Sequence, residues 1–122
     1  FMDYLVLKMK DIESPEDVSF LVDAFYKKVL EDESLSPFFA HMDFEQHKPR
    51  MEHFWNFVLF DEGGYTTNVT AVHAAMPLKK QHFDRWVVLF NQTLDAHFAG
   101  EYTEKAQQRA AIIAWTIGSK MT

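Results

Sequence analysis

His47 and His73 are the two residues of this chain whose type and setting best suit metal chemistry. His47 lies on the apolar side of an expected helix, and His73 lies in a short segment before Pro77. The apolar, aromatic run 54–60 separates them and is too apolar for a solvated surface. Two imidazoles across an apolar slot suit a flat, apolar cofactor that carries iron. Haem has these properties, and its iron takes an axial imidazole nitrogen, which we assign to His73.

Three further side chains could serve such a site. Tyr26 lies on the apolar face of the first expected helix, and Trp86 lies on that of a later one. A buried hydroxyl or indole needs a partner, and dioxygen at an iron is one possibility. Arg50 follows His47 by one helical turn and could meet a haem propionate.

Each of these candidates also has an ordinary interpretation. A histidine near a loop can be a surface residue, and one on an apolar face often forms a hydrogen bond within the core. A buried tyrosine most often donates to a backbone carbonyl, a buried tryptophan can simply pack, and Arg50 can be a solvated charge. Pattern alone leaves both interpretations open.

Composition limits the class of protein. The chain has 122 residues, 48% hydrophobic and 16% aromatic, including 12 Phe, so it contains either a bulky core or a cavity lined by rings. The net charge of −6 disfavours nucleic acid and anionic membranes as partners. With no Cys, no long apolar span and no signal peptide, a cytoplasmic protein is expected.

The hydrophobic pattern predicts an all-α fold in one domain, 1–122, with residues 1–13 as a short N-terminal extension. We expect long helices over about 15–32, 44–60 and 79–98, and a fourth that Thr103 caps. Residues 35–39 form a corner or one helical turn, and 69–75 a short helix carrying His73. Pro49 predicts a looser turn before His47, and Gly63-Gly64 should end that helix.

Other site chemistries lack their residues. The sequence has no Glu-x-x-His pairs for a carboxylate-bridged di-iron bundle and no His-Glu-x-x-His zinc motif. It also lacks a phosphate-binding glycine loop and a Gly-x-Ser-x-Gly motif. The haem interpretation therefore stays first.

Motifs along nearly the whole chain resemble those of the truncated haemoglobins, most closely the third group. Residues 17–29 are similar to the first long helix of that family, and 35–39 to the corner that follows it. Residues 44–51 and Phe54-Trp55 are similar to the distal helix, 71–73 to the proximal segment and 82–86 to the next signature of the third group. Groups I and II usually carry two glycine motifs, whereas only Gly63-Gly64 is present here.

The resemblance implies a role for each matching residue. It makes His73 the iron ligand, Tyr26 the distal tyrosine and Trp86 a distal residue. It makes His47 a distal histidine or a gate that points outward. The haem contacts that it implies are Phe39, Met51, Phe54 and Trp55.

The implied fold is a sandwich of two helices on two, and the implied cofactor is non-covalent haem b. The implied function is reversible binding of dioxygen, CO and NO by a bacterial oxygen-binding globin. An alternative is enzymatic gas chemistry, either NO dioxygenation or peroxidase-like turnover, with an external reductase. A helical interaction module without a cofactor is a further alternative. We expect a monomer or weak dimer, with no residue assigned a catalytic role.

Overall fold

The computed structural model describes residues 9–40, 43–61, 63 and 78–119. Over these residues the helices are α2 (Pro15–Glu31), α3 (Ser36–Phe39), α4 (Phe44–Phe60), α6 (Lys80–His97) and α7 (Glu101–Gly118). The helices predicted for 15–32, 44–60 and 79–98 are therefore confirmed to within two residues at each end. The expected helix over 69–75 lies outside the described residues.

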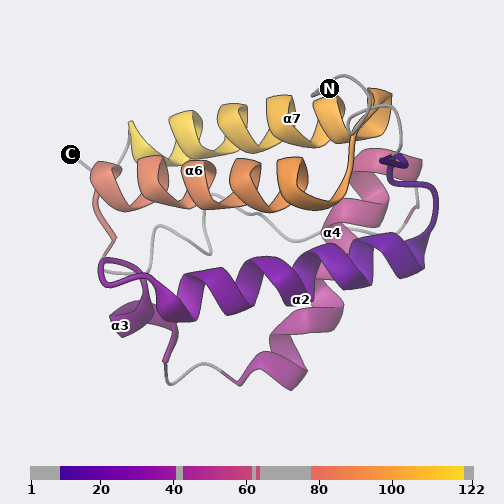
Figure 1. The fold of residues 1–122 in the computed structure, drawn as a ribbon. Coiled ribbons are helices and arrows are strands. Elements are labelled where there is room, and N and C mark those ends of the chain that lie inside the picture. Colours follow the sequence, from indigo (N-terminus) through magenta and orange to yellow (C-terminus); the bar gives the residue numbers. More distant parts are fainter. Residues whose placement is uncertain (1–8, 41–42, 62, 64–77, 120–122) are drawn as a thin grey trace.

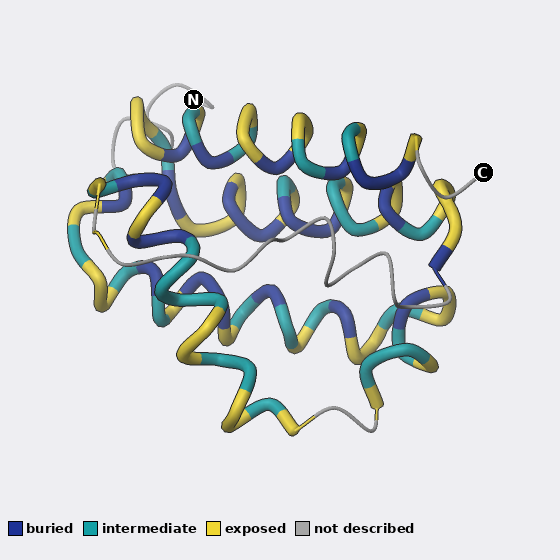
Figure 2. Tube along the Cα trace, turned by 180° about the vertical axis from the view of Figure 1, so that it is seen from behind, coloured by how far each residue is buried: buried dark blue, intermediate teal, exposed yellow. Residues whose placement is uncertain are grey.

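The helices pack as two pairs. α6 and α7 lie side by side, α2 runs along α6, and α4 crosses behind α2 (Figure 1). α4 also reaches α7, so each of the four long helices contacts at least two others. The view from behind shows buried positions on the sides that face the other helices and exposed positions outside (Figure 2). None of these helices is long and apolar enough to cross a membrane.

Four aromatic rings from three helices form the centre of the core. Phe90 of α6 is 1% exposed, and its ring stacks on Trp55 of α4 with centroids 4.8 Å apart. Trp86 also stacks on the Phe90 ring, with centroids 5.4 Å apart. Phe25 of α2 meets the Phe90 ring edge-on, with centroids 5.2 Å apart. Such rings bury large areas and prefer these stacked and edge-to-face arrangements. This ring cluster fixes α2, α4 and α6 against one another.

The first turn of α2 has the expected sequence signals but uses them differently. Ser14 occupies the N-cap position with extended backbone, and Pro15 follows in the first turn. The Ser14 side chain forms no capping hydrogen bond, whereas the Asp17 carboxylate accepts the Glu13 N–H at 2.8 Å. The helix start is therefore stabilised by Asp17, the third residue of the first turn, and not by the Ser14 side chain.

The looser turn expected before His47 is wrong, because α4 is helical from Phe44. Asp43 caps it and accepts the His47 N–H at 3.1 Å through its carbonyl. Pro49 lies inside the helix and has no N–H to give to the Glu45 carbonyl. Both of these residues are exposed, so water can satisfy that carbonyl. Proline is tolerated here for that reason.

The expected stop at Gly63-Gly64 is also wrong, because α4 ends earlier. Asp61 is the C-cap and has the left-handed backbone that glycine usually supplies, with φ of 56°. Its N–H donates to the Phe57 carbonyl at 3.1 Å. Aspartate is one of the few residues that adopt this conformation readily, so no glycine is needed at the helix end.

Thr103 does not cap α7, contrary to expectation. The N-cap is Gly100, and Thr103 is buried inside the helix. Asp11, far away in sequence, accepts the N–H groups of Tyr102 and Thr103 and the Thr103 hydroxyl at 2.7–2.9 Å. Gly100 has φ of +145°, and a Cβ there would lie 2.5 Å from the Asp11 side chain. The start of α7 is thus capped by Asp11 of the N-terminal segment and not by Thr103, the residue that the local sequence predicted.

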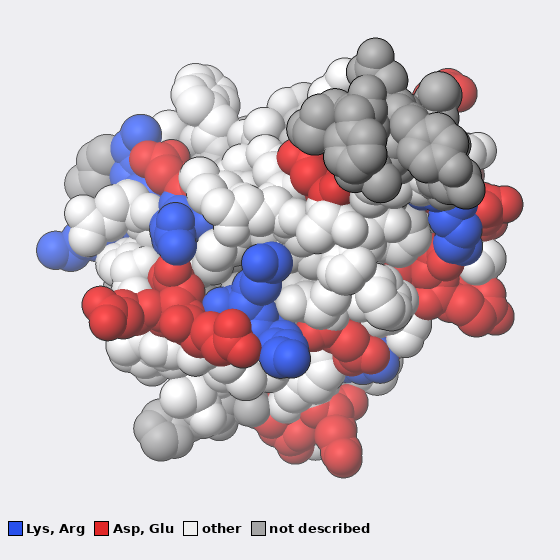
Figure 3. Space-filling model, viewed as in Figure 1, with Lys and Arg blue, Asp and Glu red and all other residues white. Residues whose placement is uncertain are grey.

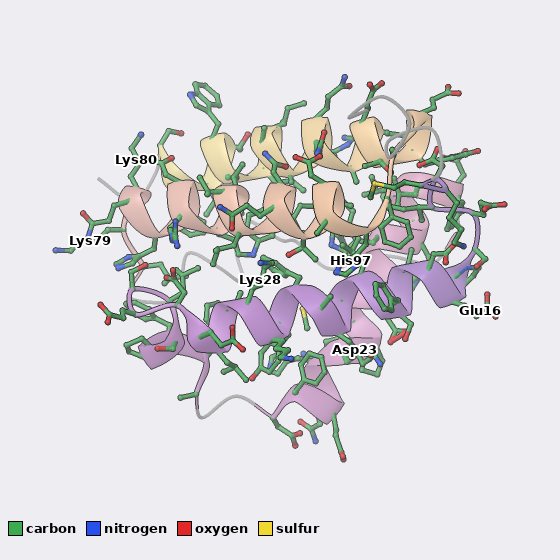
Figure 4. All side chains as sticks on the ribbon, in the orientation of Figure 1. Glu16, Asp23, Lys28, Lys79, Lys80 and His97 are labelled. Atoms are coloured by element: carbon green, nitrogen blue, oxygen red, sulfur yellow. The ribbon has the colours of Figure 1, made fainter. Side chains whose placement is uncertain are left out.

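The ionic side chains lie mainly on the outside of this packing. Acidic and basic groups are interspersed over the face that α2, α6 and α7 present (Figure 3). Asp23 projects from α2 on the side of α4 (Figure 4), where Lys48 donates to it at 2.9 Å. His97 lies over α2 in the same view, with its ring 4.9 Å from that of Phe20.

Candidate functional site

One side of α4 carries the residues that sequence reasoning assigned to the cofactor. His47, Met51 and Phe54 recur at helical spacing, so they share this side, and all three are half-buried. Trp55 lies one position further round and is only 5% exposed. Arg50 is exposed. The structure therefore places Trp55 in the core and Met51 and Phe54 against it, whereas His47 is half-buried and Arg50 lies in solvent.

Phe39 and Trp86 extend this apolar surface from other elements. Both side chains are half-buried and pack against the main core, as do Met51 and Phe54. We call the four together the open apolar face, with Phe39 from α3, Met51 and Phe54 from α4, and Trp86 from α6. Large apolar side chains that pack on a core yet keep part of their surface exposed need an apolar partner to cover them.

Ring contacts with Phe90 and Phe25 position the Trp86 side chain. It stacks on Phe90 with an interplanar angle of 3°, and Phe25 meets it edge-on with centroids 5.5 Å apart. These contacts fix the position of the indole without using its N–H. Among the described residues, none accepts a hydrogen bond from that N–H.

Tyr26 has the ordinary interaction that was considered for it from sequence. Its hydroxyl donates to the Phe39 carbonyl at 3.1 Å. Its ring stacks on Phe44 of α4 with centroids 4.0 Å apart and an interplanar angle of 18°. The tyrosine thus joins α2, the α3 corner and the start of α4, next to Phe39 of the open apolar face.

The corner between α2 and α3 depends on Asp32, which sequence reasoning did not assign to the site. Its carboxylate accepts the Ser34 hydroxyl at 2.6 Å and the Ser34 and Leu35 N–H groups at 3.2 and 3.1 Å. Arg85 of α6 donates to it from Nε at 2.7 Å. The Ser34 hydroxyl, with Arg85 and the backbone, holds the pKa of this carboxyl below its usual range.

Asp32 matters here because Arg85 precedes Trp86. The Asp32 side chain is only 7% exposed, so its ion pair with Arg85 is shielded more than a surface pair. One carboxylate therefore ties the corner that carries Phe39 to the helix that carries Trp86. The sequence does contain a signal, since Asp32-x-Ser34 after a helix is typical of a side-chain-bonded turn.

The iron ligand proposed from sequence, His73, lies outside the described residues. Among the residues described, no three His, Asp or Glu side chains form a group that could hold a metal ion. Haem requires only one strong protein ligand, and otherwise an apolar surround. The half-buried apolar side chains and the half-buried imidazole of His47 fit that requirement for one side of the cofactor.

A family model described as bacterial-like globin matches residues 10–117. The chain belongs to this globin family. The group 3 truncated haemoglobin Ctb of Campylobacter jejuni is 29% identical over 106 residues, which are 81% of this chain and 84% of the relative. The resemblance to the third group of truncated haemoglobins is thereby confirmed. Membership of the globin family implies haem as the cofactor.

Solved structures agree with this assignment. The crystal structure of the group III truncated haemoglobin from C. jejuni has a TM-score of 0.83 and 28% identity, covering 93% of this chain and 96% of that one. The Fe(III) form of the truncated haemoglobin from Tetrahymena pyriformis has a TM-score of 0.70 and 26% identity, covering 87% and 89%. The predicted all-α, globin-like fold is confirmed by these matches.

Proposed function

We propose that this globin binds haem b non-covalently and binds dioxygen reversibly, as well as CO and NO. Membership of the globin family, together with the open apolar face on α3, α4 and α6, supports the proposal. When bound, haem would supply an iron able to bind a diatomic gas, and His73 would be the residue that holds that iron.

The chain's own residues then have distinct roles. Phe39, Met51 and Phe54 cover the cofactor and exclude water, because their rings and thioether are already held by the core. Trp55 supports Phe54 from within the core, with ring centroids 5.1 Å apart. Exclusion of water strengthens any hydrogen bond formed there. Arg50 is exposed one turn from His47 and is placed to meet a haem propionate at the protein surface.

Two donors serve the gas. The hydroxyl of Tyr26 and the indole N–H of Trp86 donate toward a ligand that carries negative charge, and His47 is a third polar group on the same side. A hydrogen bond to a charged acceptor contributes about 1.5–3 kcal/mol. Because CO stays nearly neutral, these donors favour dioxygen over CO.

Optical spectroscopy tests the proposal. Purified protein is loaded with haem, reduced, and exposed to dioxygen or CO. We expect a Soret band that shifts with each gas and that loses its imidazole-ligated form in His73→Ala. His97→Ala, which removes an exposed histidine at the far end of α6, is the matched control and should keep the wild-type spectrum. Absence of a Soret band at stoichiometric haem would refute the proposal.

A further inference from the structure

The hydroxyl of Tyr26 has a single proton, and that proton is already engaged. A phenol donates one hydrogen bond and otherwise only accepts. The donated bond goes to the Phe39 carbonyl at 3.1 Å. While this bond stands, Tyr26 offers only oxygen lone pairs to any other partner. A gas ligand that needs a donor must therefore take the proton away from Phe39.

The two ends of the corner are held by different groups. Asp32 holds the first end through Ser34, Leu35 and the ion pair with Arg85. Tyr26 holds the last end through the Phe39 carbonyl. Loss of the Tyr26 bond would therefore loosen Phe39 and the residue after it while leaving the Asp32 end in place.

Within the described part of the chain, no carbonyl competes for the Trp86 indole N–H. Stacking on Phe90 and the edge contact from Phe25 fix its ring and use only its π face and edge carbons. Donation from its indole N–H requires no bond of the corner to break. Tyr26 must therefore break its hydrogen bond to Phe39 before it can donate to a ligand, whereas Trp86 need not break a bond of the corner.

We propose that the Phe39 carbonyl competes with a gas ligand for the hydroxyl proton of Tyr26. This inference rests on the proposed haem function. The main chain of α3 is then a specificity-determining group, because it weakens Tyr26 as a donor and leaves Trp86 as the principal one. It also couples ligand type to structure, since dioxygen draws the proton from Phe39 and CO leaves it in place.

Amide hydrogen exchange of the haem-loaded ferrous protein tests the coupling. The reporter is the Ala40 N–H, which donates to the Ser36 carbonyl at 2.8 Å, at the Tyr26 end. The internal reference is the Ser36 N–H, which donates to the Asp32 carbonyl at 2.9 Å, at the other end. With dioxygen, Ala40 should exchange about fivefold faster than with CO or without a ligand, the factor equivalent to one neutral hydrogen bond. Ser36 should not respond.

Tyr26→Phe should make Ala40 exchange fast in every state, haem-free protein included, because the bond to Phe39 is then absent throughout. The matched control is Tyr102→Phe, which removes the hydroxyl of an exposed tyrosine on α7 and keeps its ring contact with Phe60. Its exchange pattern should equal that of the wild type. Unchanged Ala40 exchange in Tyr26→Phe would overturn the inference.

Dioxygen dissociation rates provide the second readout. Trp86→Phe should raise the rate tenfold or more, and Tyr26→Phe by no more than about threefold. An equal or larger effect of Tyr26→Phe would overturn the inference. If the Soret band shifts with gas but dioxygen does not change the exchange rate of Ala40, the proposed competition is wrong and the haem function stands. No Soret band would remove the haem function and the competition together.

Discussion

The ring cluster and the open apolar face contain the same types of residue but differ in how far these residues are buried. Phe90 and Trp55, at the centre of the ring cluster, are 1% and 5% exposed. Phe39, Phe54 and Met51 are equally apolar, yet they stay half-buried although they pack against that core. Trp86 belongs to both regions. The two regions therefore differ in burial within the protein and not in hydrophobicity.

Removing one ring from each region tests whether the two regions have different roles. Phe90→Ala should lower the free energy of unfolding by about 3–5 kcal/mol, because a fully buried ring leaves a cavity that three neighbouring rings cannot fill. The loss should be the same with and without haem. Urea unfolding of both forms measures it, and a loss below 1 kcal/mol would show that Phe90 is not central.

Phe54→Ala should behave in the opposite way. Since this side chain is half-buried, its removal should lower the stability of the haem-free protein by clearly less than Phe90→Ala does. Haem should then dissociate faster, by tenfold or more, because part of the apolar cover is lost. Transfer of haem to an acceptor protein measures the rate. Equal losses for Phe54→Ala and Phe90→Ala in haem-free protein would erase the distinction between the two regions.

The Asp32 corner joins the two regions, and its strength should depend on pH. Asp32→Ala should lower the stability by about 1.5–3 kcal/mol near neutral pH, because several bonds to one carboxylate are lost. The pKa of Asp32 is lowered by the Ser34 hydroxyl, by Arg85 and by the Leu35 backbone, so its contribution is complete above the unfolded-state pKa of about 3.9. It is lost as the pH falls through the lower folded-state pKa.

Urea unfolding between pH 7 and pH 2 checks the Asp32 prediction. The gap between wild type and Asp32→Ala should stay constant down to about pH 4 and then close. Asp84→Ala is the matched control, because its exposed i,i+4 pair with Lys80 should contribute less than about 1 kcal/mol. A gap that widens in acid would contradict the assigned direction of the pKa shift.

The smallest effect is expected at the rim of the open apolar face. Arg50→Gln should weaken haem binding by less than about 1 kcal/mol, and the effect should fade at high salt, because the guanidinium is exposed. Haem titration at two ionic strengths measures it. A large effect that does not depend on salt would place Arg50 inside the site and not at its edge.

Periodicity was enough to predict the helices and the inward residues. Val18, Leu21 and Phe25 recur at helical spacing, and all three are buried in α2. Helix ends were less predictable, because Asp61 replaces a glycine and Asp11 caps α7 from a distant part of the chain. No local pattern reports a partner so far away in sequence.

The candidate site was predictable only by residue type. Sequence reasoning named Tyr26, Phe39 and Trp86; the structure joins the first two by a hydrogen bond and packs Trp86 against Phe25 of α2. It could not show that the Tyr26 hydroxyl donates to the Phe39 carbonyl, because the two residues are brought together only by the turn between α2 and α3. The role of His73 stays a prediction.

The most direct test of the account is whether haem lies against the open apolar face. We would label the methionine methyl groups with ¹³C, assign Met51 with Met51→Leu, and record spectra without haem and with ferrous haem and CO. The porphyrin ring current should move the Met51 methyl far upfield, while Met9, two residues before the Asp11 that caps α7, stays near its original position. A full Soret band with an unmoved Met51 methyl would contradict the assignment of this face to the cofactor.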